Sequence, residues 1–179
     1  KVLAIFNSFP DDIVLVHVED GIFHEKLCTF PFVSRSYCEL AGGICPENYL
    51  RYRIDDHVYN VFNLLAIFQH KRIAYLPDVV FEHLNYVLDQ KGVAEYVPDP
   101  VIHAKDTGLF DQLLGERKSL AIKLATRIDA YRQRQTEDTR RKLLSPIDDS
   151  IALRRPEYIR TLLNGQPKIG ATRVTIGVV

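Results

Sequence analysis

Cysteine is scarce in this sequence, and neither sign of charge is in excess. The three cysteines are odd in number and do not have the spacing of metal ligands. We therefore expect Cys28, Cys38 and Cys45 to be small apolar side chains in a reducing compartment rather than a disulfide framework. Lys plus Arg equals Asp plus Glu at 23 each, so the basic excess typical of nucleic-acid binding is missing. Nucleic acid is therefore not an expected partner.

Long apolar runs and an apolar leader are missing as well. The apolar runs are interrupted by charges and fall far below the roughly 20 residues that a membrane-spanning helix needs. No basic segment followed by an apolar one opens the chain. We expect no transmembrane segment and a cytoplasmic location. The 179 residues, 46% apolar and 26% charged, are typical of one globular domain with an appendage.

Strand patterns occur in the first half of the chain. Strands are predicted in apolar runs that are mostly β-branched, at residues 2 to 6, 12 to 18 and 72 to 76. The turn signal Asp20-Gly21 predicts a hairpin from the second of these strands into residues 22 to 27. Pro77 and Asp78 are expected to end the third strand.

A short helix is predicted at residues 34 to 41, between the second and third strands. Ser36 and Glu39 have the spacing of a capping box, in which each side chain bonds a free backbone N–H group of the first turn. Gly42 and Gly43 follow, and glycine adopts the positive φ of a helix end without steric cost. The helix therefore has both a start signal and a stop signal.

A longer amphipathic helix is predicted at residues 57 to 69. Apolar side chains recur there every three or four positions, which places them on one helix face. Asp55 or Asp56 is the expected N-cap. Because strands and helices alternate, the sequence predicts an α/β fold with a mixed sheet flanked by helices.

The pattern changes toward the C-terminus. Residues 119 to 144 predict one long helix that is amphipathic at first and almost wholly polar from 132 to 142. The polar half is either solvated or a contact surface for a partner or a membrane. Pro146 is expected to end it, and residues 156 to 163 predict another short helix. We divide the chain into an α/β part, a helical extension and a strand or tail, at residues 1–118, 119–164 and 165–179.

Carboxylates and one imidazole lie at the ends of these predicted elements. They precede a strand, precede a helix or follow the last strand: Asp11, Asp12, Asp55, Asp56 and His83. Mg²⁺ and Mn²⁺ prefer carboxylate oxygens, sometimes with an imidazole, on loops where a diphosphate can share the ion. The sequence therefore contains the components of a divalent-cation site.

The order of several segments resembles a known family. The segments are the Asp11-Asp12 strand, Phe30–Arg35, Gly42–Pro46, Tyr52–Asp56 and Arg72–His83. Together they resemble the family 2 glycosyltransferases with the A-type (GT-A) fold, over about residues 1 to 87, roughly half of the chain. In that family the nucleotide-binding part precedes these segments. The chain thus resembles the acceptor-side half of such an enzyme.

The resemblance implies a reaction and its cofactors. In that family a sugar moves from a nucleotide-diphosphate donor, here expected to be UDP-linked, to a hydroxyl acceptor with the help of Mn²⁺ or Mg²⁺. Asp11, Asp12 and His83 would then be the metal ligands, because they match the family's carboxylate motif and its later histidine. The metal stabilises the charge that grows on the departing diphosphate.

The resemblance also implies a general base. A carboxylate must take the proton of the acceptor hydroxyl, and the acidic pair at the predicted helix start matches the family's base, with Asp56 preferred and Asp55 next. Arg53 and Tyr52, just before this pair, are expected to contact the sugar or phosphate of the donor.

Each of these positions also has an ordinary structural interpretation. Asp11 and Asp12 are typical of a turn, Asp55-Asp56 of a helix N-cap, and His83 of a partly buried histidine. The chain as a whole is alternatively a non-catalytic protein that binds a nucleotide diphosphate or another partner. A metal-dependent hydrolase with the same carboxylates is a further alternative.

Overall fold

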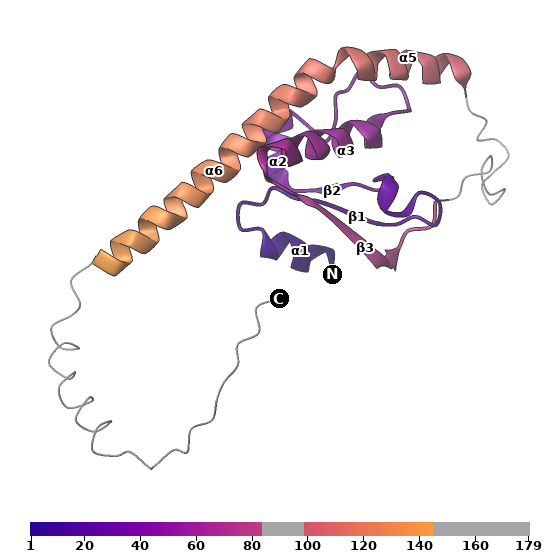
Figure 1. The fold of residues 1–179 in the computed structure, drawn as a ribbon. Coiled ribbons are helices and arrows are strands. Elements are labelled where there is room, and N and C mark those ends of the chain that lie inside the picture. Colours follow the sequence, from indigo (N-terminus) through magenta and orange to yellow (C-terminus); the bar gives the residue numbers. More distant parts are fainter. Residues whose placement is uncertain (84–98, 145–179) are drawn as a thin grey trace, which may run out of the picture. The chain divides into compact units, whose positions relative to one another are not determined.

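The computed structural model of this protein describes residues 1–83 and 99–144. The chain divides into two compact units, residues 1–134 and 135–179. In the first unit, helix α1 (Val2–Ser8) lies on one side of the sheet, and helices α2 (Arg35–Ala41) and α3 (Ile54–Leu65) lie on the other side (Figure 1). The elements are, in chain order, α1 (Val2–Ser8), β1 (Leu15–Glu19), η1 (His24–Lys26), β2 (Phe32–Val33), α2 (Arg35–Ala41), α3 (Ile54–Leu65), η2 (Ala66–Phe68), β3 (Ile73–Val80), α5 (Pro100–Gln112) and α6 (Leu114–Leu144).

The central strand of the sheet is β1, and the strand order is β2-β1-β3. β2 pairs with β1 antiparallel, with Leu15 opposite Val33, whereas β3 pairs parallel, with Leu15 opposite Ile73. The register of the parallel pair shifts between Val18 and Glu19. This mixed sheet, flanked by helices, confirms the predicted α/β class.

The side chains of β1 are buried on both faces of the sheet. Leu15 and Val16 are fully buried and Val18 is 3% exposed. Leu15 faces the core built with α2, α3 and α6, while α1 lies on the other side of the sheet (Figure 1). Branched apolar residues suit a pleated strand that is covered on both faces.

Both helices predicted beside the sheet are present, but their starts differ from the predictions. α2 is capped by Ser34, whose hydroxyl accepts the N–H of Tyr37 at 3.1 Å, so the predicted pairing of Ser36 with Glu39 is wrong. Gly42 ends α2 with a φ of 82°, as the sequence predicted.

The start of α3 also differs from its prediction. The helix begins at Ile54 and Arg53 occupies the N-cap position, so Asp55 and Asp56 are first-turn residues instead of the predicted caps. Their charges still complement the positive end of the helix dipole. The apolar face is buried as expected, with Val58, Val61 and Leu65 fully inaccessible.

Two segments predicted as strands fold otherwise. Residues 2 to 6 belong to α1, in which the helix satisfies its own backbone groups. The predicted hairpin strand at 22 to 27 is instead a turn with η1, because the Asp20 carboxylate accepts three of the backbone N–H groups that follow it. β3 runs past Pro77 to Val80, on the edge of the described sheet, where the missing proline N–H is tolerated.

Helices α5 and α6 follow the sheet. The sequence analysis did not predict α5, which Asp99 caps by accepting the N–H groups of Val101 and Ile102 at 2.8 and 3.1 Å. α6 begins earlier than predicted, at Leu114, and buries Leu124 and Ile128 in the core. The predicted segments 156–163 and 165–179 lie outside the described residues.

From Arg132 to Leu144, α6 is exposed at every position. Leu143 and Leu144 at its end are 79% and 72% exposed. Among the described residues, no helix combines the length and the apolarity that crossing a membrane requires.

Candidate functional site

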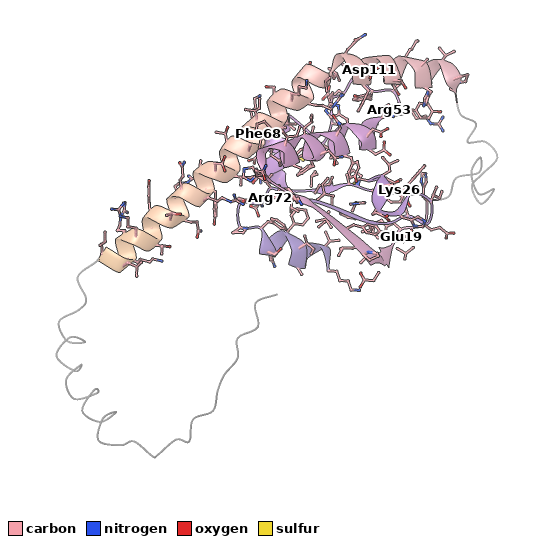
Figure 2. The ribbon with its side chains drawn as sticks, in the orientation of Figure 1. Glu19, Lys26, Arg53, Phe68, Arg72 and Asp111 are labelled. Carbon is pink, nitrogen blue, oxygen red and sulfur yellow. The ribbon has the colours of Figure 1, made fainter. Side chains whose placement is uncertain are left out.

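The parallel strands place their carboxyl ends at one edge of the sheet. β1 leads directly into Asp20, and β3 leads into His83, whose backbone N–H donates to the Asp20 carbonyl at 2.9 Å. Figure 2 shows Glu19 and Lys26 at this end of the sheet and Arg72 at the opposite end. In open α/β sheets, ligands bind beyond the carboxyl ends of the strands. We call this end of the sheet the carboxyl edge.

Asp20 organises the loop that follows β1. One carboxylate oxygen accepts the N–H groups of Ile22, Phe23 and His24 at 2.9, 2.8 and 3.0 Å, and the other accepts the Thr29 hydroxyl at 2.6 Å. Burial by itself would raise the pKa of Asp20, but these hydrogen bonds outweigh it and hold the pKa below its ordinary value. Asp20 is thus a charged anchor for the loop.

The first turn of α3 brings Asp55 toward this edge. Burial raises the pKa of Asp55, and the neighbouring Asp56 charge adds to the increase, while the charge of His83 opposes it. The backbone N–H of Asp56 donates to the Asp55 carboxylate at 2.9 Å. Among the described residues, no basic side chain lies within ion-pair distance of Asp55. This carboxyl is therefore more basic than an ordinary aspartate.

Asp56, the neighbouring carboxylate, is held by a cation. The Arg53 guanidinium donates to Asp56 at 2.9 Å, and both side chains are about one-third exposed, at 33% and 30%. Arg53 also packs over the Phe110 ring at 5.3 Å and lies 3.4 Å from the Thr107 hydroxyl. Its φ of 66° is in the left-handed region, which non-glycine residues rarely adopt and which recurs at functional sites.

The loop before α3 is fixed by Asp106 of α5. The carboxylate of Asp106 is 1% exposed and accepts the N–H groups of Leu50, Arg51 and Tyr52 at 3.0, 2.8 and 2.7 Å. The Tyr52 hydroxyl in turn accepts the Asp99 N–H at 3.0 Å. These bonds set the position from which α3, with its two carboxylates, begins.

A buried histidine supports the same turn of α3 from the core side. His57 is 3% exposed, and its Nδ1 lies 3.0 Å from the Tyr49 hydroxyl. Burial, assisted by the charge of Arg117, lowers the pKa of His57 to about 4. His57 is therefore neutral at physiological pH.

His83 lies among aromatic rings at the end of β3. The Phe23 and Phe30 rings are each 6.0 Å from its ring, measured between centroids. Its Nδ1 is 3.8 Å from the Asp20 carboxylate, too far for a hydrogen bond, and has no hydrogen-bond partner among the described residues. The charge of His83 acts on Asp55 and lowers the pKa of that carboxyl, although no hydrogen bond or ion pair joins the two side chains.

Asp11 and Asp12 lie at the other end of β1. Arg72 binds Asp11 through two hydrogen bonds of 3.0 and 2.8 Å, and both side chains are buried. The N–H of Ile13 donates to the same carboxylate at 3.0 Å. Asp12 is exposed, with a φ of 60°, and its N–H donates to the Phe9 carbonyl at 2.8 Å.

The structure does not bring the predicted metal ligands together. The length of β1, roughly 17 Å at about 3.3 Å per residue, separates Asp11 and Asp12 from His83. The Asp11 oxygens already bind Arg72 and Ile13. Within residues 1–83 and 99–144, no three His, Cys, Asp or Glu side chains are grouped as a metal site requires. The set of Asp11, Asp12 and His83 therefore does not fit one metal ion.

Sequence reasoning missed two carboxylates that shape this edge. Asp20 was interpreted only as part of a turn, although its position directly after a buried strand was a usable signal. Asp106 had no recognisable motif, because its partners lie more than fifty positions away in the chain.

Comparisons with family models, curated proteins and solved structures found no significant match. The resemblance to family 2 glycosyltransferases therefore remains a hypothesis based on the quoted segments.

Proposed function

We propose that this chain provides the acceptor side of a nucleotide-sugar-dependent glycosyltransferase. The observation that carries the proposal is Asp55, a carboxyl of raised pKa at the carboxyl end of two parallel strands, within the electrostatic reach of His83. Titratable groups whose pKa is shifted by their surroundings at such an edge are candidates for catalysis. The reaction class is taken from the resemblance of residues 1 to 87 to the family 2 glycosyltransferases.

In the proposed reaction, Asp55 is the general base. The acceptor oxygen attacks the anomeric carbon of the donor sugar, its proton passes to the Asp55 carboxylate, and the bond from the sugar to the diphosphate breaks. A base works best when its pKa approaches the working pH, which favours the buried Asp55. The sequence favoured Asp56, but Arg53 binds that carboxylate and makes it the weaker candidate.

Arg53 and Tyr52 have a positioning part in this proposal. Arg53 binds Asp56 and packs on Phe110, and Tyr52 is bonded to Asp99 and Asp106. These contacts fix the start of α3 and so the direction of Asp55. A UDP-linked donor and a divalent cation stay part of the proposal, with His83 as the residue of this edge suited to the ion.

The test is a transfer assay on the full chain. UDP- and GDP-linked sugars are offered with a panel of hydroxyl acceptors, with Mn²⁺ and with EDTA. We expect transfer that Asp55→Asn abolishes, because an amide keeps the shape of the carboxylate but takes up no proton. Asp56→Asn should retain more activity than Asp55→Asn.

Two results would change the assignment. Loss of transfer in Asp56→Asn together with normal transfer in Asp55→Asn would move the base to Asp56. Nucleotide binding, seen as a rise in melting temperature, without transfer to any acceptor would favour the non-catalytic nucleotide-diphosphate-binding protein. Release of free sugar without an acceptor would indicate a hydrolase.

The exposed half of α6 is the proposed contact surface for a partner or a membrane. Every position from Arg132 to Leu144 is exposed, and basic residues recur along this stretch. The test is sedimentation with anionic vesicles at low and high salt, compared with a truncation after residue 131. A role in binding anionic membranes would be contradicted if salt did not change the amount of protein that sediments with the vesicles and if the truncated protein sedimented to the same extent.

A further inference from the structure

Phenylalanine rings are concentrated at the carboxyl edge. Three of them contact one another and the fourth, Phe23, joins them through His83, and we call the group the phenylalanine platform: Phe23, Phe30, Phe32 and Phe81. The Phe81 ring lies 5.8 Å from Phe30 and 5.7 Å from Phe32 between centroids, in edge-to-face geometry. Phe23 and Phe30 also flank His83, so the platform adjoins the residues of the proposed site.

Phe81 is the open part of the platform. Its side chain is 45% exposed, directly after β3 and two residues before His83. Its N–H donates to the Glu19 carbonyl at 2.8 Å, so the backbone beneath the ring is fixed. An exposed aromatic ring on a fixed backbone gives a ligand a flat apolar surface at small entropic cost.

The charged groups around the platform are mainly acidic. Glu19 and Asp20 lie at the end of β1, and Asp55 and Asp56 lie in the first turn of α3. Two of the nearby cations are engaged, because Arg53 binds Asp56 and His24 lies 2.8 Å from Glu19, and Lys26 is a further positive charge at this end of the sheet (Figure 2). An anionic ligand would therefore meet mainly like charges, whereas a neutral polyhydroxy ligand would meet hydrogen-bond acceptors.

We infer that the phenylalanine platform binds the acceptor, and that the acceptor is a neutral glycan. A pyranose ring has one face of C–H groups, which packs on the Phe81 ring, and a rim of hydroxyls, which donate to carboxylates such as Asp55. This inference rests on the proposed function only in one respect, namely that the bound glycan accepts the transferred sugar. Glycan binding itself does not depend on transfer.

The experiment is saturation-transfer NMR on the full chain without a donor. The probes are the neutral disaccharides cellobiose, lactose and chitobiose, with glucuronic acid and a short polyisoprenyl phosphate as anionic comparisons. We expect at least one neutral disaccharide to bind and Phe81→Ala to weaken that binding about tenfold or more, whereas Phe81→Tyr retains it.

The matched control is Phe68→Ala. Phe68 is 42% exposed, close to the value for Phe81, but lies before β3 near Arg72, at the opposite end of the sheet (Figure 2). This variant should bind the disaccharide like the wild type. Equal melting temperatures of the two alanine variants would show that the platform variant remains folded.

The inference would be overturned if no neutral disaccharide bound, if only the anionic probes bound, or if Phe68→Ala weakened binding as much as Phe81→Ala. Failure of the proposed function gives a different result. Glycan binding that depends on Phe81, without transfer from any donor, would uphold the platform and remove the glycosyltransferase. Transfer whose acceptor KM is unchanged in Phe81→Ala would uphold the enzyme and remove the platform.

Discussion

The two ends of β1 use carboxylates in different ways. Before the strand, Asp11 is buried and bound by Arg72 through two hydrogen bonds, and the guanidinium also lies 4.8 Å from the centroid of the Phe9 ring. Near the other end, Asp55 is partly buried and has no ion-pair partner among the described residues. The charge of Asp11 is thus balanced within the fold, whereas Asp55 is a carboxyl with a raised pKa.

This difference separates a stabilising pair from a candidate reactive group. Removing one partner of a buried ion pair leaves an uncompensated buried charge, so the loss of either partner alone is strongly destabilising. A carboxylate that burial makes more basic costs stability, and proteins retain such groups mainly where function needs them. The same residue type near the two ends of one strand therefore has opposite expected effects on stability.

The largest expected effect is at the amino end of β1. Asp11→Asn should lower the free energy of unfolding by about 3–5 kcal/mol, because Arg72 stays buried without its counter-charge. Urea unfolding at pH 7 measures this loss. The control is Asp78→Asn, which removes the partner of Lys1 in a pair whose side chains are 58% and 62% exposed and should leave the midpoint unchanged. Equal effects of the two variants would contradict the structural role of Asp11.

The next effect depends on pH and concerns the first turn of α3. The pKa of His57 is about 4 in the folded chain and about 6.5 in the unfolded chain, so below about pH 6.5 only the unfolded chain takes up the proton. Stability should therefore fall by about 3 kcal/mol as the pH drops from about 6.5 to about 4. Urea unfolding of wild type and His57→Gln at several pH values measures the part due to this residue. A variant that keeps the full wild-type dependence would refute the assignment.

A smaller effect is expected where α5 fixes the loop before α3. Asp106→Asn replaces a buried charged acceptor of three N–H groups, which should cost about 2 kcal/mol in chemical unfolding. The control is Asp111→Asn on the same helix, an exposed position that Figure 2 labels. It should change stability by less than about 0.5 kcal/mol. Similar losses in both variants would show that the contacts of Asp106 are not specific.

The smallest expected change in stability is at Asp55, and its sign is opposite to that of the change at Asp11. Asp55→Asn should cause no loss of stability at pH 7 and a gain of up to about 1 kcal/mol. The reason is that the raised pKa of Asp55 makes its ionised form a destabilising group above that pKa. Thermal unfolding at pH 7 measures the change. A loss comparable to that of Asp11→Asn would mean that Asp55 is a structural residue like Asp11.

The sequence was sufficient for the elements with strong local patterns. The buried run around Leu15 predicted β1, and the apolar face of Val58 and Val61 predicted α3. Gly42 predicted the end of α2. α5 was missed although Asp99 and Pro100 form a recognisable cap and first helical position. Residues 2 to 6 were misassigned because a short apolar run fits a strand and a helix equally well.

The candidate site was only partly predictable, because its geometry depends on distant contacts. Asp55 and His83 were found from the sequence, but the parallel pairing of β1 with β3 places only His83, beside Asp20, and the position of Asp55 depends on α3. That Arg72 would bind Asp11 could not be read from the sequence, since the residues lie 61 positions apart. The preference for Asp55 over Asp56 depends on burial and on Arg53, which local patterns do not contain.

The central claim is that the carboxyl edge, and not the amino end of β1, is the functional site. The most direct test is a two-dimensional amide NMR titration of the full chain with a UDP-sugar, Mn²⁺ and a neutral disaccharide. The account predicts shifted amide signals for Asp20, Asp55, Phe81 and His83, with Ile13 and Arg72 unchanged. Shifts confined to Ile13 and Arg72, or no shift with any of these ligands, would contradict it.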